Sequence, residues 1–174
     1  MTDKKALRAI GYGLYLLGAR TFEKANACVI NTFMQLASDP LTVSIASTKT
    51  GYTHDMIMSS GRFTISVLTV NAPYSVYERF GMKSGRDTDK LEGVGGVKYD
   101  INGVPYFTEG TNARFSCRVI TSHDFGSHTL FTAEVTESEV LSSDDSVTYA
   151  YYQKYVKPRP EPVKEEKSGW RCGV

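Results

Sequence analysis

The chain has 174 residues, a formal net charge of +1, 41% hydrophobic residues and 22% charged residues. This length suffices for one domain with a sizeable core, and the composition is that of a folded rather than a disordered protein. The near-zero net charge gives no global attraction to nucleic acid, and no apolar run approaches the roughly 20 residues of a membrane span. We therefore expect neither nucleic acid nor membrane as a partner.

The start of the chain resembles a signal peptide only superficially. Basic residues precede an apolar segment, but Asp3 and Arg8 interrupt the pattern and no convincing cleavage site follows. Cys28, Cys117 and Cys172 are odd in number and scattered, which is not a disulfide framework. Both features indicate a cytoplasmic protein.

The first half of the chain predicts three strands and a helix. Alternating and β-branched patterns place the strands at residues 12–19, 27–35 and 41–46, paired in chain order as an antiparallel meander. A helix is predicted from Thr53, as its N-cap, to Ser60, with Gly61 at the C′ position.

The second half predicts more strands and little helix. A strand is expected at 63–70, a short helix from Pro73, a charged glycine-rich loop at 82–97, an extended segment at 104–107, and a hairpin of 113–123 with 128–140. The tyrosine-rich segment 148–155 suits a sheet edge or a subunit interface. Six to eight strands with two short helices favour a closed or split antiparallel barrel, and no G-x-G-x-x-G supports a Rossmann fold.

Residues 47–54, STKTGYTH, join the third strand to the helix and carry a chemical signal. Hydroxyls, an ammonium and a glycine lead into a helix N-terminus, where unpaired backbone N–H groups and the helix dipole favour an anion. An ordinary capped turn would produce the same pattern. The sequence therefore predicts an anion site here, and leaves the identity of the anion open.

The order of these features resembles the flavin reductase family, the FMN-binding split barrel. The similar segments are INTFMQLASDP, STKTGYTHDMI, SGRFTISVLT, SGRDTDKLEGV and GSHTLFTAEV, spanning about residues 14–155. The resemblance implies a mainly β fold, an antiparallel split β-barrel with a few short helices. It also implies FMN as cofactor, NAD(P)H as co-substrate and a homodimer.

The resemblance also assigns candidate cofactor-binding residues. One group would line the isoalloxazine ring and the other would hold the phosphate: Ala27, Cys28, Val29, Asn31 and Thr32 for the ring, and Ser47, Thr48, Lys49, Thr53 and His54 for the phosphate. Lys90 and Arg86 are candidate phosphate or nucleotide contacts. Ordinary roles in an edge strand, a capped turn and a solvated loop remain the alternatives.

His128 is the candidate nicotinamide contact, in the turn Gly126-Ser127-His128. Family members with an acidic middle residue place this histidine near the nicotinamide, and Ser127 departs from that pattern. A plain hairpin residue is the alternative reading of His128. No residue is expected to act as a catalytic acid or base, because the cofactor carries the hydride chemistry, and no metal site is expected.

The end of the chain suggests a second domain. After a charged, proline-rich segment, Trp170-Arg171-Cys172-Gly173-Val174 resembles the start of a rubredoxin, whose first knuckle reads Cys-x-x-Cys-Gly. We expect a flavin reductase-like domain at 1–156, a linker at 157–168, and a truncated rubredoxin start at 169–174. A free tail in which Cys172 is coincidental is the alternative.

These expectations combine into one predicted function. The protein would be an FMN-binding oxidoreductase that takes hydride from NAD(P)H and passes electrons to a rubredoxin-type or flavodiiron acceptor. Two alternatives stay open: a flavoredoxin-like electron carrier that does not oxidise NAD(P)H itself, and a non-catalytic split-barrel binding module.

Overall fold

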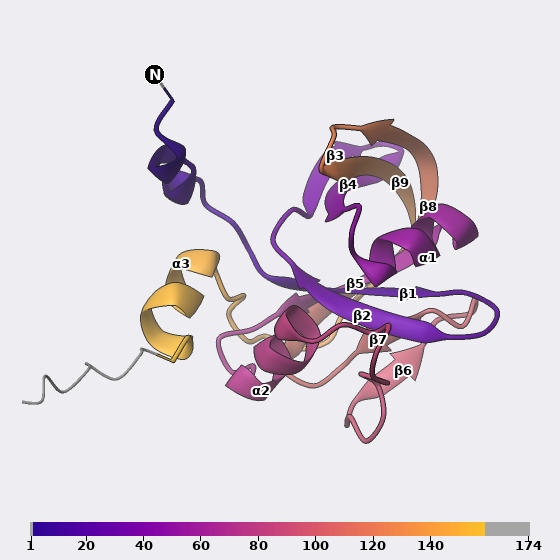
Figure 1. Ribbon diagram of the computed structural model, residues 1–174. Coiled ribbons are helices and arrows are strands. Elements are labelled where there is room, and N and C mark those ends of the chain that lie inside the picture. The colour runs from indigo at the N-terminus through magenta and orange to yellow at the C-terminus, as the bar shows by residue number, and fades with distance from the viewer. Residues whose placement is uncertain (1, 159–174) are drawn as a thin grey trace, which may run out of the picture.

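The computed structural model describes residues 2–158, which form a curled antiparallel sheet with short helices around it (Figure 1). Seven strands hydrogen-bond in the order β2-β1-β5-β8-β9-β4-β3. Their bounds are β1 Tyr15–Arg20, β2 Ala25–Ile30, β3 Met34–Ser38, β4 Leu41–Thr48, β5 Arg62–Leu68, β8 Thr111–Asp124 and β9 His128–Val140. A separate two-stranded sheet pairs β6 (Val97–Tyr99) with β7 (Pro105–Phe107).

The two edges of the large sheet meet at a seam. β2 and β3 lie at opposite edges, yet only Asn31, Thr32 and Phe33 separate them along the chain. Four residue steps span at most roughly 14 Å, so the sheet has to curl until its edges approach each other. The Thr32 hydroxyl bridges the seam, donating to the Ala46 carbonyl at 2.7 Å and accepting from the Ala46 N–H at 3.2 Å. The predicted antiparallel split barrel is confirmed.

Two details of the predicted strand arrangement are wrong. The single strand expected at 27–35 is broken into β2 and β3, because the chain crosses the seam there. The third predicted strand, β4, pairs with the end of the second, at Met34 and Gln35 of β3, but not with β2, and its other neighbour is β9. The alternation of apolar and polar residues predicts which face of the sheet a side chain occupies, but it does not predict which strand lies next to the residue's own strand.

The helices are short, as predicted, with two corrections. α1 (Tyr52–Ser60) ends at Gly61, whose φ is 64°, but its N-cap is Gly51 and not Thr53. The tyrosine-rich segment, predicted for a sheet edge or a subunit interface, is not an edge strand but forms α3 (Tyr149–Tyr151) and a π-helical turn. The other bounds are a 3₁₀ helix Lys4–Ala9, α2 (Tyr74–Tyr77), and π-helical turns at Glu78–Met82 and Tyr152–Val156.

Two apolar clusters lie on either side of β1, so this strand is buried on both faces. Leu17 joins the cluster that Met56 and Ile57 of α1 cover, whereas Leu16 joins the one that Phe80 covers from the π-helical turn after α2. Each fully buried large aliphatic side chain contributes about 1.5–3 kcal/mol relative to its exposed state. This packing fixes α1 and the π-helical turn against β1 and β2.

Within residues 2–158, every helix is too short or too polar to cross a membrane. The predicted rubredoxin start at 169–174, and the predicted linker from residue 159 onward, lie outside the described residues. The domain boundaries therefore stay predictions.

Candidate functional site

A cavity of about 350 Å³ opens where α1 begins, between β2 and the loop that follows α2. Its walls come from four segments that are distant in sequence. The lining residues are Asn26, Cys28, Val29 and Ile30 from β2; Ser47, Thr48, Thr50, Gly51, Tyr52 and Thr53 from the end of β4, the turn and the start of α1; Phe80, Gly81, Met82, Lys83, Ser84 and Gly85 from the π-helical turn and the loop after it; and Lys90 further along that loop.

The start of α1 forms the polar end of this cavity. Gly51 is the N-cap and has no side-chain capping bond, and the first intrahelical bond runs from Asp55 N–H to the Gly51 carbonyl at 3.4 Å. The first-turn amides of Tyr52 and Thr53 therefore have no intrahelical acceptor, and the helix dipole adds partial positive charge. The Gly51 N–H closes the preceding turn by donating to the Thr48 carbonyl at 3.0 Å. An anion would be stabilised at this position.

Lys90 supplies a full positive charge to the same cavity. Its side chain is buried, 4% exposed, and the ammonium donates a long hydrogen bond of 3.4 Å to the Phe80 carbonyl. No carboxylate in residues 2–158 forms an ion pair with it. Burial lowers the pKa of Lys90, partly offset by the nearby Cys28 thiol, because a weakly solvated ammonium is costly. A bound anion would remove that cost.

A buried hydrogen bond holds the two inner walls of the cavity together. The Asn26 side-chain amide in β2 donates to the Thr53 hydroxyl in α1 at 2.9 Å, and both residues are 2% exposed. Gly85 of the loop packs against the same amide so closely that an added Cβ would run into Asn26. The Cys28 thiol lies beside this contact, and burial raises its pKa, which keeps it neutral. The walls are thus fixed relative to each other.

Six of the eleven predicted cofactor-binding residues line the cavity: Cys28, Val29, Ser47, Thr48, Thr53 and Lys90. Ala27 is fully buried in the apolar cluster under α2, and Thr32 serves the barrel seam. Asn31 lies at the same seam and is absent from the cavity wall. The sequence predicted β2 and residues 31–32 as one strand, but β2 lines the cavity whereas residues 31–32 lie at the barrel seam.

Two predicted phosphate ligands point elsewhere. Lys49 forms an ion pair with Asp124 at 2.6 Å, beyond the cavity at the tip of the β8–β9 hairpin. Both ring nitrogens of His54 have partners, Nε2 with the Thr129 hydroxyl at 2.9 Å and Nδ1 with Asp55 at 3.1 Å. Neither side chain contributes to the cavity wall.

His128 also lies at the hairpin tip. It is exposed, forms a hydrogen bond through Nδ1 with the Ser127 hydroxyl at 2.8 Å, and pairs in register with Thr48 at the end of β4. It is absent from the cavity wall. Arg86 lies at the outer side of the loop, where it forms an ion pair with Asp55.

The sequence missed most of the loop side of the cavity. Thr50, Gly51 and Tyr52 fell inside the predicted anion turn, and Ser84 and Gly85 belong to the segment SGRDTDKLEGV that carries the resemblance, but residues 80–83 gave no signal of their own. They reach the cavity because the helix from Pro73 ends in the π-helical turn Glu78–Met82. Such turns are frequent at functional sites, but their position is set by tertiary packing.

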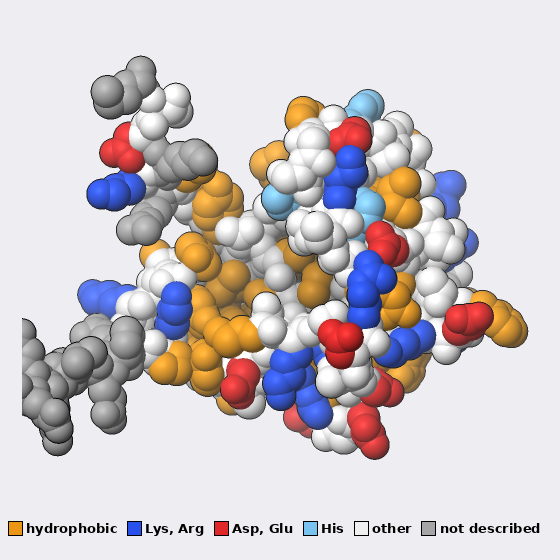
Figure 2. Space-filling model, viewed as in Figure 1, with side chains coloured by type: hydrophobic (Ala, Val, Ile, Leu, Met, Phe, Trp, Pro, Cys, Tyr) orange, Lys and Arg blue, Asp and Glu red, His pale blue; other side chains and the backbone are white. Residues whose placement is uncertain are grey.

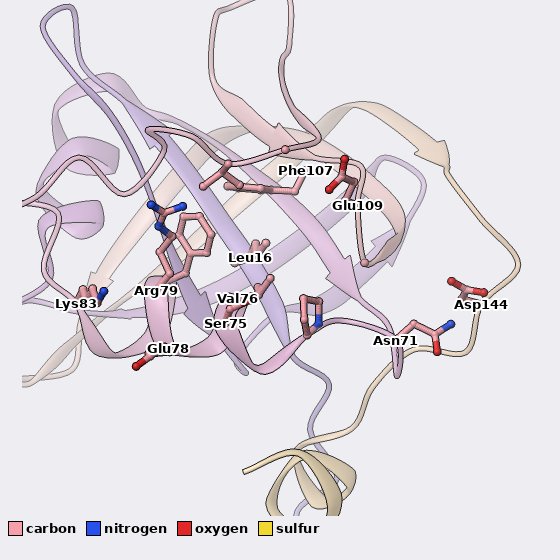
Figure 3. A pocket seen from close by; sticks show the side chains of 15 residues that line it. Leu16, Asn71, Ser75, Val76, Glu78, Arg79, Lys83, Phe107, Glu109 and Asp144 are labelled. Atoms are coloured by element: carbon pink, nitrogen blue, oxygen red, sulfur yellow. The ribbon is translucent and has the colours of Figure 1, made fainter. Parts of the chain in front are cut away.

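A second cavity, of about 520 Å³, lies under α2 and shares Phe80 and Lys83 with the first (Figure 3). Its wall carries cations, including Arg79, and carboxylates, including Glu109 and Asp144. Figure 3 shows Arg79 on the α2 side near Phe107, with Asp144 at the far end. This mixed charge indicates no single class of ligand.

The fold and the first cavity together define a class of protein. It is a split antiparallel barrel with a cavity that contains a helix start and a buried lysine and lies beside an edge strand. The family model described as Flavin reductase like domain matches residues 7–158, and the chain belongs to this family. The predicted family is confirmed, and with it an oxidoreductase function in flavin chemistry.

Relatives and solved structures agree with this assignment. The chain is 38% identical over 152 residues to high molecular weight rubredoxin of Moorella thermoacetica, covering 87% of this chain and 66% of that protein. It is 33% identical over 150 residues to ferric-chelate reductase (NAD(P)H) of Archaeoglobus fulgidus, covering 86% and 88%. A flavoredoxin from Methanosarcina acetivorans has the same fold, with a TM-score of 0.71 at 20% identity, covering 80% and 74%.

Proposed function

We propose that the protein binds FMN in the first cavity and oxidises NAD(P)H. The observation that carries this proposal is the buried Lys90 ammonium, without an ion-pair partner in residues 2–158, in the same cavity as the open N-terminus of α1. A phosphate monoester with about two negative charges suits one ammonium with several N–H and O–H donors. FMN bound there would accept a hydride from NAD(P)H and pass its electrons on.

The residues of the cavity divide the binding between its two ends. The first-turn amides of α1, with the hydroxyls of Thr50 and Thr53 and the ammonium of Lys90, would hold the phosphate. β2 is an edge strand, so its outer backbone N–H and C=O groups have no partner strand. Cys28, Val29 and Ile30 line the cavity along β2 and would present these groups to the ring system.

We propose that the acceptor is a rubredoxin-type or flavodiiron protein. The support is the 38% identity to a protein named high molecular weight rubredoxin, of which this chain spans 66%. On this proposal residues 1–156 are the flavin domain, 157–168 a linker, and 169–174 the beginning of a rubredoxin domain. A purified rubredoxin that is reduced by NADH only in the presence of this protein would support the acceptor; an unreduced rubredoxin would contradict it.

We further propose a cytoplasmic homodimer. Tyr151 and Tyr155, 36% and 62% exposed, contact each other on the outer side of α3 and its π-helical turn. Leu7 and Ile10, in the N-terminal segment that projects from the barrel in Figure 1, are 59% and 48% exposed. Figure 2 shows hydrophobic side chains gathered on the side of the molecule where these segments project. Burial of these side chains in a partner subunit would stabilise both projecting segments. Multi-angle light scattering that returns a mass of one chain would contradict the dimer.

The visible spectrum tests the function directly. The purified protein, or the protein after incubation with FMN and removal of excess, is expected to retain flavin absorbance. Anaerobic NADH or NADPH is then expected to bleach that absorbance. A protein that takes up no FMN would contradict the proposal.

A flavoredoxin-like electron carrier is the second candidate function. The observation that favours it is the position of His128, which is exposed and outside the cavity wall. A carrier would retain FMN, but anaerobic NAD(P)H would leave the flavin oxidised, whereas a chemical reductant would bleach it.

A further inference from the structure

The loop from the π-helical turn to Lys90 forms the outer wall of the FMN cavity, and it is tied to the start of α1. Arg86 in this loop forms an ion pair with Asp55 of the first helical turn. The Arg86 guanidinium also lies over the ring of Tyr52, 5.0 Å from its centroid. Tyr52 is itself part of the cavity wall. The loop and the proposed phosphate site are therefore joined directly by side chains.

A second contact to this loop comes from the turn that joins β1 to β2. The Lys24 ammonium donates to the Gly85 carbonyl at 2.6 Å and lies 5.6 Å from the centroid of the same Tyr52 ring. Gly85 is buried against Asn26. Arg86 and Asp55, in contrast, are each 48% exposed, so their ion pair can break and re-form without disturbing the core.

We propose that the Asp55–Arg86 ion pair is a latch that holds this loop over bound FMN and sets the rate at which FMN leaves. The inference rests on the proposed function. Arg86 and Asp55 are positioning residues, because neither belongs to the cavity wall. Opening the pair would free Arg86 from Tyr52 and leave the loop attached through Gly85 and Lys90. The latch decides whether FMN behaves as a retained cofactor or as an exchanging one.

Asp55→Asn distinguishes the latch from a purely electrostatic effect of Asp55, because the two predict opposite changes in the rate of FMN release. Asp55 carries a negative charge in the helical turn that would face the phosphate. Removing that charge alone would strengthen phosphate binding and slow the release of FMN. Removing the latch would speed release, by about three- to tenfold for a half-exposed ion pair with ring stacking. The FMN dissociation rate is measured by timed ultrafiltration and by fluorescence after rapid dilution.

Arg86→Lys provides a second variant with unchanged charge. Lysine keeps the cation near the phosphate but loses the planar fork that pairs with Asp55 and stacks on Tyr52. Electrostatics alone predicts no change, and the latch predicts faster release. Arg118→Gln is the matched control, since it breaks an exposed Arg118–Glu134 ion pair on β8 and β9, away from the cavity.

Three results together would support the latch. FMN release is faster in both latch variants, and the double variant Asp55→Asn with Arg86→Lys releases FMN no faster than the single variants. Arg118→Gln releases FMN at the rate of the unaltered protein. Unchanged or slower release in Asp55→Asn, with native circular dichroism, would overturn it. Failure of the unaltered protein to bind FMN would instead overturn the proposed function. The two failures are therefore distinguishable.

Discussion

Two regions of the molecule each contain a lysine that was predicted to contact an anion, and only one of these lysines lines the cavity. At the tip of the β8–β9 hairpin, Lys49 is 39% exposed and neutralised by Asp124. In the cavity, Lys90 is 4% exposed and has no carboxylate partner within residues 2–158. Lys49 lies within the hydroxyl-rich turn that predicted the anion site. Lys90 lies in a loop 38 residues beyond Tyr52, the first residue of α1, and its sequence context gave only a weak signal.

The difference between these lysines lies in solvation rather than in sequence context. An exposed ammonium is stabilised by water and by its ion pair, so an added phosphate would bring little. The buried Lys90 ammonium has lost water and gained only a long hydrogen bond to the Phe80 carbonyl and a contact with the Phe80 ring, so an anion would stabilise it more strongly. The comparison therefore predicts that FMN binding depends on Lys90 and not on Lys49.

Replacing each lysine by methionine tests this comparison with the largest expected effect. Lys90→Met is expected to raise the Kd for FMN by roughly ten- to a hundredfold, the range for loss of a charge-assisted hydrogen bond. Lys49→Met is expected to change it by less than about twofold. Isothermal titration calorimetry with the apoprotein measures both. Equal effects of the two substitutions would contradict the distinction.

The pH dependence of FMN binding gives the next largest effect. Burial lowers the pKa of Lys90 in the free protein, and a bound phosphate would raise it again. Affinity is therefore full below the lowered pKa of the free protein and declines as pH rises toward the higher pKa of the complex. The slope can reach about tenfold per pH unit for one proton. Titrations from pH 7 upward are expected to show this decline in the unaltered protein and to lose it in Lys90→Met.

The sequence predicted the fold well because the relevant signals are local. The β8–β9 hairpin, the helix ending at Gly61 and the anion turn each depend on residues adjacent in the chain. The seam could not be predicted in the same way, because Asn31 and Thr32 continue an extended pattern and only closure of the barrel turns them away. Their apparent role as ring contacts came from the resemblance, and the structure gives Thr32 a backbone partner in Ala46.

The candidate site was predictable on one side only. The turn before α1 is recognisable from the sequence, because hydroxyl side chains and a glycine precede a helix. The opposite wall depends on a π-helical turn and on the packing of Gly85 against Asn26, neither of which follows from periodicity. Lys90 was named as a contact through the resemblance, but its burial is a property of the folded chain.

Thr32→Val separates the seam from the cavity. Valine has nearly the same shape, but it removes both hydrogen bonds to Ala46 and leaves those backbone groups without this partner. We expect a loss of about 1–3 kcal/mol in the free energy of unfolding, toward the lower end because Thr32 is only half-buried. Urea unfolding of the apoprotein measures it. The Kd for FMN is expected to stay within about twofold; a large change in Kd at unchanged stability would make Thr32 a ligand contact after all.

His128→Ala has the smallest expected effect on the affinity for FMN and tests the role of the hairpin tip most directly. The side chain is exposed, bonded to Ser127, and outside the cavity wall, so the Kd for FMN is expected to change by less than about twofold. The rate of anaerobic flavin reduction by NADH is the informative measurement. If the tip contacts the nicotinamide, that rate falls in His128→Ala while FMN affinity holds, and Lys49→Met at the same tip provides the matched control. If both variants reduce the flavin as fast as the unaltered protein does, the hairpin tip takes no part in the reaction. The hydride donor then has to approach from the side of the cavity that Phe80 and Lys83 share with the second cavity.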